Sequence, residues 1–422
     1  MVIKSSKEKM HEEISQGIYR FVVPGNKFLF EGFWPVRDGV TMNSYLVKGE
    51  KTALIDGVWG VSDTPEKFAQ MLKKTGTDAK NIDYVVLNHL EPDHTGWLSY
   101  LSSINPKILI YASEKGVEIA KSLYNLKNIK AVKTGDILDL GRSKVLEFTE
   151  IPNVHWPETM MTFEKDSKIL FCCDLFGGFG YKKGYYYDDQ VSEFDDFYYD
   201  EYLRYYSNII GMVSVASKQA TMKVKDIPYK MIAPGHGLIW KKEPKFIVNL
   251  YEKFANWQKN PEKKKITVVA GSMYGNSMKA LDFVLKILDK KGVDYELFFV
   301  PENPFGVQKK KKHVPGYQNV SDILRSAWES KGMIISAPTY EYKLFPPMAA
   351  VLEELARKRI GNRKVLRIGS YGWSGGAQRD IEKILSDNSV SWEMDVCEFK
   401  GAADKKSLSE ISSKTESLLK SL

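Results

Sequence analysis

The sequence reads Asn88-His89-Leu90-Glu91-Pro92-Asp93-His94-Thr95-Gly96 directly after the apolar run Tyr84–Leu87. The apolar run predicts a buried strand, and the proline and glycine that follow predict that the strand gives way to a loop. Open α/β sheets place their functional sites on such loops, at the carboxyl ends of strands. Residues two apart in an extended segment point the same way, so His89 and Glu91 are expected to share one metal ion while Asp93 and His94 serve another.

The same setting recurs at three other expected strand ends. They are Leu146–Pro152 followed by His155, Ile169–Cys173 followed by Asp174, and Tyr229–Ala233 followed by His236. An isolated His-x-Glu pair is usually an ordinary polar loop. Four converging strand ends would instead assemble four of the six histidines of the chain with three carboxylates, which favours a two-metal site.

The order of these residues along the chain resembles that of proteins with the metallo-β-lactamase-type fold, whose zinc enzymes carry His-x-His-x-Asp-His followed by His, Asp and His. Glu91 stands where those enzymes have their second histidine. Together with a flavodoxin-like second half, this difference is the pattern of the flavodiiron proteins, and the resemblance covers nearly the whole chain. Zinc prefers nitrogen and sulfur ligands, whereas two histidines with carboxylate oxygens and an open position suit non-haem iron. Glu91 therefore favours iron.

Composition excludes several classes of protein. A chain of 422 residues that is 43% hydrophobic predicts two domains, and a net charge of +8 from scattered lysines does not support nucleic-acid binding. No apolar stretch has the length of a membrane span, so we expect a soluble, cytoplasmic protein. The three cysteines, Cys172, Cys173 and Cys397, are expected to pack in the core. Because the sequence contains no Cys-x-x-Cys pair, no fused rubredoxin-type centre is expected, and a separate molecule is expected to deliver electrons.

Two domains are expected in the α/β class. Residues 1–260 should form a metallo-β-lactamase-like αββα sandwich that ends with helix Pro244–Gln258, and residues 265–422 a flavodoxin-like, doubly wound parallel sheet of five strand–helix units. The charged segment Lys259–Lys265, with its proline, is interpreted as a linker. No chemistry is assigned to the tyrosines of residues 181–206, because tyrosine stripes usually serve packing.

Three turns of the second domain are candidates for a flavin site. The first, at residues 271–277, offers hydroxyls and backbone N–H groups at a helix N-terminus, and it lacks the glycine pattern of dinucleotide sites. The other two offer aromatic planes and amides for a flat ring. All three resemble the FMN loops of flavodoxins, and Ser370–Gly376 resembles the flavodiiron version, although Glu341 stands where that family more often has asparagine. The residues expected to bind FMN are Ser272, Met273, Tyr274, Gly275, Asn276, Ser277, Pro338, Thr339, Tyr340, Glu341, Ser370, Tyr371, Gly372, Trp373, Ser374, Gly375 and Gly376.

The resemblance implies how the parts would work together. It assigns one iron to His89, Glu91 and His155, the other to Asp93, His94 and His236, and the bridge to Asp174. FMN would pass electrons from a separate donor, rubredoxin or another reduced carrier, to the two irons. These would reduce dioxygen to water and/or nitric oxide to nitrous oxide, with the preferred gas left open. A head-to-tail homodimer, or a dimer of dimers, would set the flavin of one chain against the iron pair of the other.

Two other hypotheses explain part of the pattern. A binuclear zinc hydrolase with a flavodoxin-like appendage is disfavoured by Glu91 and the three flavin loops. An electron carrier whose first domain has lost its metal is disfavoured because all seven ligand positions are filled. The basic run Gln308–His313 is either a solvated loop or a patch that steers an acidic donor, whose attraction salt would screen.

Overall fold

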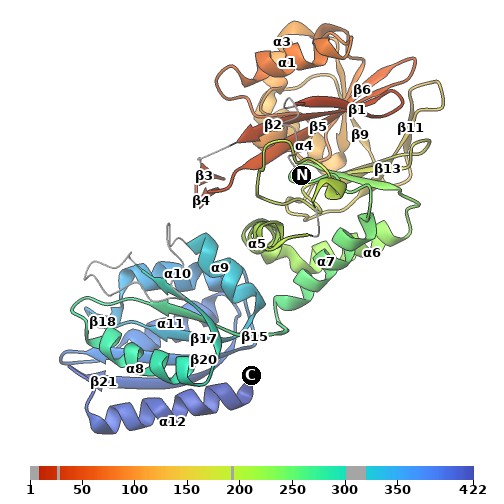
Figure 1. Ribbon diagram of the computed structural model, residues 1–422. Coiled ribbons are helices and arrows are strands. Elements are labelled where there is room, and N and C mark those ends of the chain that lie inside the picture. The colour runs from red at the N-terminus through yellow and green to blue at the C-terminus, as the bar shows by residue number, and fades with distance from the viewer. Residues whose placement is uncertain (1–8, 26–28, 192–193, 301–319) are drawn as a thin grey trace. The chain divides into compact units, whose positions relative to one another are not determined.

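A computed structural model describes residues 9–25, 29–191, 194–300 and 320–422 (Figure 1). The basic run Gln308–His313 lies outside these residues. The chain divides into two compact units, one comprising the chain up to Tyr206 with Val213–Glu252, the other Ser207–Met212 with Lys253–Leu422. The division at residues 260–265 stays a prediction. Within the described ranges, no helix has both the length and the apolar character needed to cross a membrane.

The first unit contains two sheets. Among the described residues, the larger sheet has, in spatial order, β1 (His11–Ser15), β2 (Ile18–Gly25), β5 (Val40–Lys48), β6 (Thr52–Ile55), β7 (Tyr84–Val86), β8 (Leu109–Ser113) and β9 (Ile129–Val132). The smaller sheet has β10 (Ile137–Asp139), β11 (Val145–Glu150), β12 (Met160–Glu164), β13 (Ile169–Cys173) and β14 (Met231–Pro234). Neighbours are antiparallel from β1 to β6 and from β10 to β13, whereas β6 to β9 and the pair β13–β14 are parallel. A small ladder pairs β3 (Leu29–Phe30) with β4 (Trp34–Pro35).

Helices cover the two sheets. They are α1 (Thr64–Lys74), α2 (Pro92–Thr95), α3 (Leu98–Ile104), α4 (Glu114–Tyr124), α5 (Asp196–Tyr205), α6 (Ser214–Lys225) and α7 (Pro244–Trp257), with short 3-10 or π turns η1 (Ala79–Asn81), η2 (Asp188–Gln190), η3 (Tyr206–Ile210) and η4 (Gly211–Val213). Leu146 and Phe148 alternate with more exposed neighbours along β11 and enter a core shared with Val47 and Ile55 of the larger sheet. Helices α1, α3 and α4 pack on the opposite face of that sheet. The expected αββα sandwich is confirmed.

The second unit is a parallel sheet in the order β16 (Asp294–Phe299), β15 (Lys263–Ala270), β17 (Ser330–Ser336), β20 (Arg363–Tyr371) and β21 (Trp392–Lys400). Helices α8 (Asn276–Lys290) and α12 (Lys405–Ser421) pack on one face. The other face carries α9 (Val320–Glu329), where Ser326 bonds to Thr267 of β15 at 2.8 Å, and α10 (Pro346–Arg357) packs between α9 and α11 (Ala377–Asp387). A short hairpin, β18 (Thr339–Tyr340) and β19 (Lys343–Leu344), follows β17.

This strand order is the doubly wound order 2-1-3-4-5 that was expected. The order in which successive strands join the sheet reverses between the parallel strands β15 and β17. The loops after these two strands part at that point, which is where such sheets bind ligands. Two local expectations were wrong. Lys263–Lys265, interpreted as linker, belong to β15, and Asp93 and His94, expected on a loop, lie on the short helix α2.

Candidate metal centre and flavin pocket

Five segments of the first unit bring the expected metal ligands together. His89 and Glu91 follow β7, Asp93 and His94 lie on α2, His155 follows β11, Asp174 follows β13 and His236 follows β14. All seven side chains are at least nine-tenths buried. Their donor atoms form two groups that could each hold an ion: one of His89, Glu91, His155 and Asp174, the other of Asp93, His94 and His236.

Asp174 lies between the two groups. Its Oδ2 atom is 3.3 Å from Nε2 of His89 and 3.1 Å from Nε2 of His155. Its Oδ1 atom is 3.0 Å from Nε2 of His94 and 3.2 Å from Nε2 of His236. One carboxylate therefore presents a separate oxygen to each pair of histidines, which is the geometry of a bridging ligand.

The donor set fits metal ions better than a hydrogen-bond network. Ligands about 2.0–2.2 Å from one ion lie roughly 3 Å from each other, and the distances around Asp174 match that separation. Several buried donor atoms of the cluster have no hydrogen-bond partner among the described residues: both carboxylate oxygens of Asp93, Oδ2 of Asp174 and Nε2 of His236. Buried polar atoms without partners are costly unless an ion satisfies them.

Two further groups orient these histidines, and sequence analysis missed both. Glu158 accepts a hydrogen bond from Nδ1 of His89 at 2.9 Å, and the carbonyl of Thr41 accepts one from Nδ1 of His236 at 2.7 Å. Each bond leaves the Nε2 atom of its histidine free to bind a metal. The rings of Trp156 and Phe30 stand edge-on to His89 and His236, at 5.2 and 5.6 Å between centroids. A buried acid three residues after His155 is the one sequence signal that could have identified Glu158.

Electrostatics in this cluster favour charged groups in spite of burial. Burial by itself would raise the pKa of Asp174, but the charges of His89 and His94 outweigh it and hold that pKa well below its usual range. Burial likewise opposes protonation of the histidines, yet the carboxylates of Asp174 and its neighbours raise the pKa of His155 to about 9 and that of His236 to about 10. The ionised carboxylates therefore attract cations to the imidazoles beside them, and a metal ion that binds there replaces the protons of the histidines.

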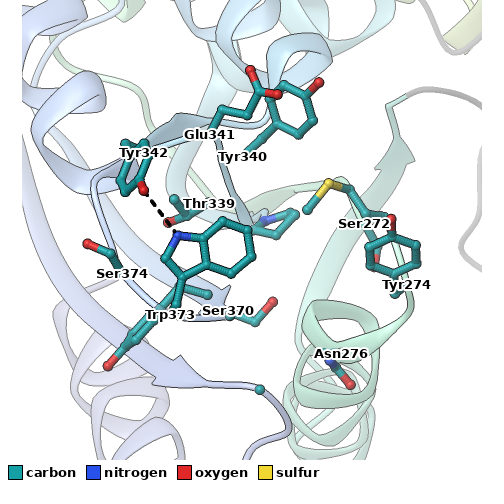
Figure 2. Close-up of a pocket in the computed structure, with 15 residues that line it drawn as sticks. Ser272, Tyr274, Asn276, Thr339, Tyr340, Glu341, Tyr342, Ser370, Trp373 and Ser374 are labelled. Carbon is teal, nitrogen blue, oxygen red and sulfur yellow. Dashed lines mark hydrogen bonds between the residues drawn. The ribbon is translucent and has the colours of Figure 1, made fainter.

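The second unit contains a cavity of about 340 Å³ at the carboxyl edge of its sheet (Figure 2). It is lined by Ser272, Met273, Tyr274, Asn276, Pro338, Thr339, Tyr340, Glu341, Tyr342, Ser370, Tyr371, Gly372, Trp373, Ser374 and Gly401. Trp373 lies across the cavity from Tyr274 and its Nε1 atom is 3.4 Å from the hydroxyl of Tyr342. Trp373 is 74% exposed and Tyr274 is 85% exposed. Their aromatic planes are therefore accessible to a ligand.

Local structure around the cavity suits a phosphate. The Oγ atom of Ser272 accepts a hydrogen bond from the backbone N–H of Gly275 at 2.9 Å, which closes the turn before α8. Gly275 has φ +90° and nothing within 4 Å of the position of an added Cβ, so the space beside the start of α8 is open. The first N–H groups of a helix have no partner within the helix and can bind a phosphate in such a space. Four residues expected to bind FMN do not line the cavity: Gly275, Ser277, Gly375 and Gly376. Ser277 lies behind the cavity, with its hydroxyl 2.9 Å from that of Ser370. Tyr342 and Gly401 line the cavity but were not among the residues expected to bind FMN.

Comparison with known proteins agrees with this architecture. Residues 40–237 match the model for the ODP family of beta lactamases, and residues 264–394 match that for NADPH-dependent FMN reductases. An anaerobic nitric oxide reductase flavorubredoxin of Vibrio vulnificus is 33% identical over 353 residues, 83% of this chain and 67% of the relative. The chain belongs to the flavodiiron protein family.

Solved flavodiiron structures show the same fold. A variant of the flavo di-iron protein of Thermotoga maritima is 28% identical with a TM-score of 0.84, covering 96% of this chain and 98% of that one. The rubredoxin oxygen:oxidoreductase of Desulfovibrio gigas, at 23% identity, has a TM-score of 0.86 and covers 97% and 98%. The flavodiiron arrangement of a sandwich followed by a flavodoxin-like sheet thus accounts for nearly all of the chain.

Proposed function

We propose that this flavodiiron protein is an oxidoreductase in which FMN passes electrons to a non-haem diiron site that reduces dioxygen to water and/or nitric oxide to nitrous oxide. The observation that supports this proposal most directly is that each of the two carboxylate oxygens of Asp174 lies close to a different pair of histidines. The names of the flavorubredoxin and oxygen oxidoreductase relatives support both gases as substrates.

The ligand assignment follows the two groups of donor atoms. His89, Glu91 and His155 would hold one iron, Asp93, His94 and His236 the other, and Asp174 would bridge them. Irons held by these residues would supply electrons for the reduction of either gas. Glu158 and the Thr41 carbonyl hold the imidazoles of His89 and His236 in the orientation that aims Nε2 at the metals.

The flavin would occupy the cavity of the second unit. Ser272 and Asn276, at the N-terminus of α8, would hold the phosphate, and Trp373 with the 338–342 loop would flank the ring. Their aromatic planes would shield the faces of the ring from water, and the backbone of these loops would orient it. The seventeen residues predicted to bind FMN stay candidates in this proposal.

Partners and location complete the proposal. A separate electron donor, rubredoxin or a similar carrier, would reduce the flavin, and two chains would pair head to tail, alone or as a dimer of dimers. We place the protein in the cytoplasm, a location that is consistent with its three free, buried cysteines.

Metal and flavin analysis tests the assignment against the zinc hydrolase alternative. Protein produced with both iron and zinc supplied, and purified anaerobically, should hold about two irons and one FMN per chain, because the carboxylates of Glu91, Asp93 and Asp174 favour iron over tetrahedral zinc. Full zinc occupancy under these conditions would reject the role given to Glu91. Replacing Glu91 with histidine should shift the bound metal toward zinc while leaving FMN in place.

A further inference from the structure

Two arginines of strand β20, Arg363 and Arg367, are completely buried, yet their surroundings differ. The guanidinium of Arg363 is saturated with backbone carbonyls: it donates to those of Trp257, Gln258, Ala327, Trp328 and Gly361 at 2.5–3.2 Å. Arg367 donates from Nη1 to the carbonyl of Ile368, whereas its Nε and Nη2 atoms have no hydrogen-bond partner among the described residues. A buried cation left this incomplete is unusual and costly.

Arg367 faces one carboxylate, that of Glu398 on β21. The Nη2 atom of Arg367 and Oε1 of Glu398 are 3.8 Å apart, beyond hydrogen-bond distance, and this Oε1 also lacks a partner within the part of the chain that the structure describes. Burial lowers the pKa of Arg367 to about 10, so the guanidinium stays charged at neutral pH. The pair is therefore a buried positive charge that its partner neutralises only in part.

This pair lies against the base of the third loop of the flavin cavity. A Cβ added at Gly369 would lie 2.6 Å from Nη2 of Arg367, and one added at Gly375 would lie 3.6 Å from Oε2 of Glu398. Between these two glycines, Ser370–Ser374 line the cavity. Glu398 is also the register partner of Gly369 across β20 and β21. Both charges thus lie directly beneath backbone that would touch the flavin.

We propose that Arg367 and Glu398 tune the reduction potential of the bound flavin from beneath this loop, Arg367 raising it and Glu398 moderating that effect. The inference rests on the FMN binding proposed above. Fully reduced FMN loses a proton from its ring near neutral pH and becomes more negative than oxidised FMN. A buried cation in a medium of low dielectric therefore stabilises the reduced form over the oxidised form, and a nearby anion such as the partly buried Glu398 does the reverse. Neither residue lines the cavity, so both act through their fields.

The test measures the two-electron midpoint potential of FMN in the holoprotein by spectroelectrochemical titration, with the dissociation constant of oxidised FMN measured in parallel. In Arg367→Met we expect the reduced flavin to bind about tenfold less tightly relative to the oxidised flavin, which lowers the midpoint by about 30 mV. Glu398→Gln should raise the midpoint, and Arg367→Lys should retain most of the wild-type value. Arg363→Met is the matched control, because it removes a fully bonded arginine four residues farther from the loop; its shift should be less than half as large.

The decisive result is that the midpoint potential shifts in opposite directions in Arg367→Met and Glu398→Gln. A merely structural role would loosen the loop in both variants and would move both potentials the same way or not at all, and either outcome overturns the inference while leaving FMN binding intact. If Arg367→Met does not fold, Glu398→Gln should still raise the midpoint while Arg367→Lys leaves it near the wild-type value, and any other pattern overturns the inference. A wild-type chain that binds no FMN would overturn both this inference and the proposed function.

Discussion

At the scale of single residues, the sequence predicts the candidate metal ligands that the structure brings together, because four of them lie within six consecutive positions. It does not predict the groups that orient them. Residue type and spacing alone identify four of the candidate ligands, His89, Glu91, Asp93 and His94. Glu158 reads as an ordinary acid until the fold places its carboxylate 2.9 Å from Nδ1 of His89. The Thr41 partner of His236 is a backbone carbonyl, which no side-chain pattern reveals.

Glu158 provides a prediction at this scale. Glu158→Gln should weaken metal binding about 10–100-fold, because partners of this kind fix the orientation and basicity of the imidazole they hold. Competition with a chelator, followed through released iron, measures the change. Glu118→Gln, an exposed glutamate on α4, is the matched control and should release iron like wild type. Equal iron affinity in both variants would show that Glu158 does not support the site.

At the scale of elements, the sequence predicts strands and helices well where pattern and burial agree, and poorly where tertiary context decides. Strand β13 begins and ends at the expected residues, Ile169 and Cys173. Lys263–Lys265 look like a solvated linker, yet Lys265 is buried because Glu296 of β16 and Glu329 of α9 pair with it at 3.0 and 2.6 Å. The periodicity of one segment carries no information about ion-pair partners that other strands and helices supply.

This ion cluster predicts how stability depends on pH. Burial alone would raise the pKa of Glu296, but Arg325 and Lys265 outweigh it and lower that pKa from 4.5 to about 2. The stabilisation from ionised Glu296 is therefore complete above pH 4.5 and is lost as the pH falls toward 2. It amounts to about 3 kcal/mol, from 1.36 kcal/mol per pKa unit.

Urea unfolding of the second unit, followed through FMN release, checks this prediction in wild type and Glu296→Gln. The wild type should be more stable at pH 7, and the difference between the two should close as the pH approaches 2. Glu393→Gln, which alters an exposed acid of β21, should parallel wild type throughout. A difference in the free energy of unfolding between wild type and Glu296→Gln that does not change with pH would show that ionisation of Glu296 is not the cause.

At the scale of the whole molecule, the two cofactor sites lie in separate units, so electron transfer is a question of assembly. If two chains pair head to tail, the flavin of one serves the irons of the other. Asp174→Ala, unable to hold iron, would be combined with a flavin-deficient chain that carries Asn276→Asp and Gly372→Asp. Verified mixed dimers should regain activity that does not change on dilution, because they contain one intact flavin facing one intact metal site. Transfer confined within a chain would leave these mixed dimers inactive.

The most direct measurement of the central claim is gas consumption by the anaerobically reduced holoprotein, followed with an oxygen or nitric oxide electrode. We expect the wild type to consume one or both gases through repeated turnovers while its flavin is kept reduced. Asp174→Ala, with its flavin content unchanged, should lose this activity, because both pairs of histidines lose the carboxylate between them, and Asp139→Ala, which alters an exposed acid, should consume gas like wild type. Consumption at the wild-type rate by Asp174→Ala would contradict the account.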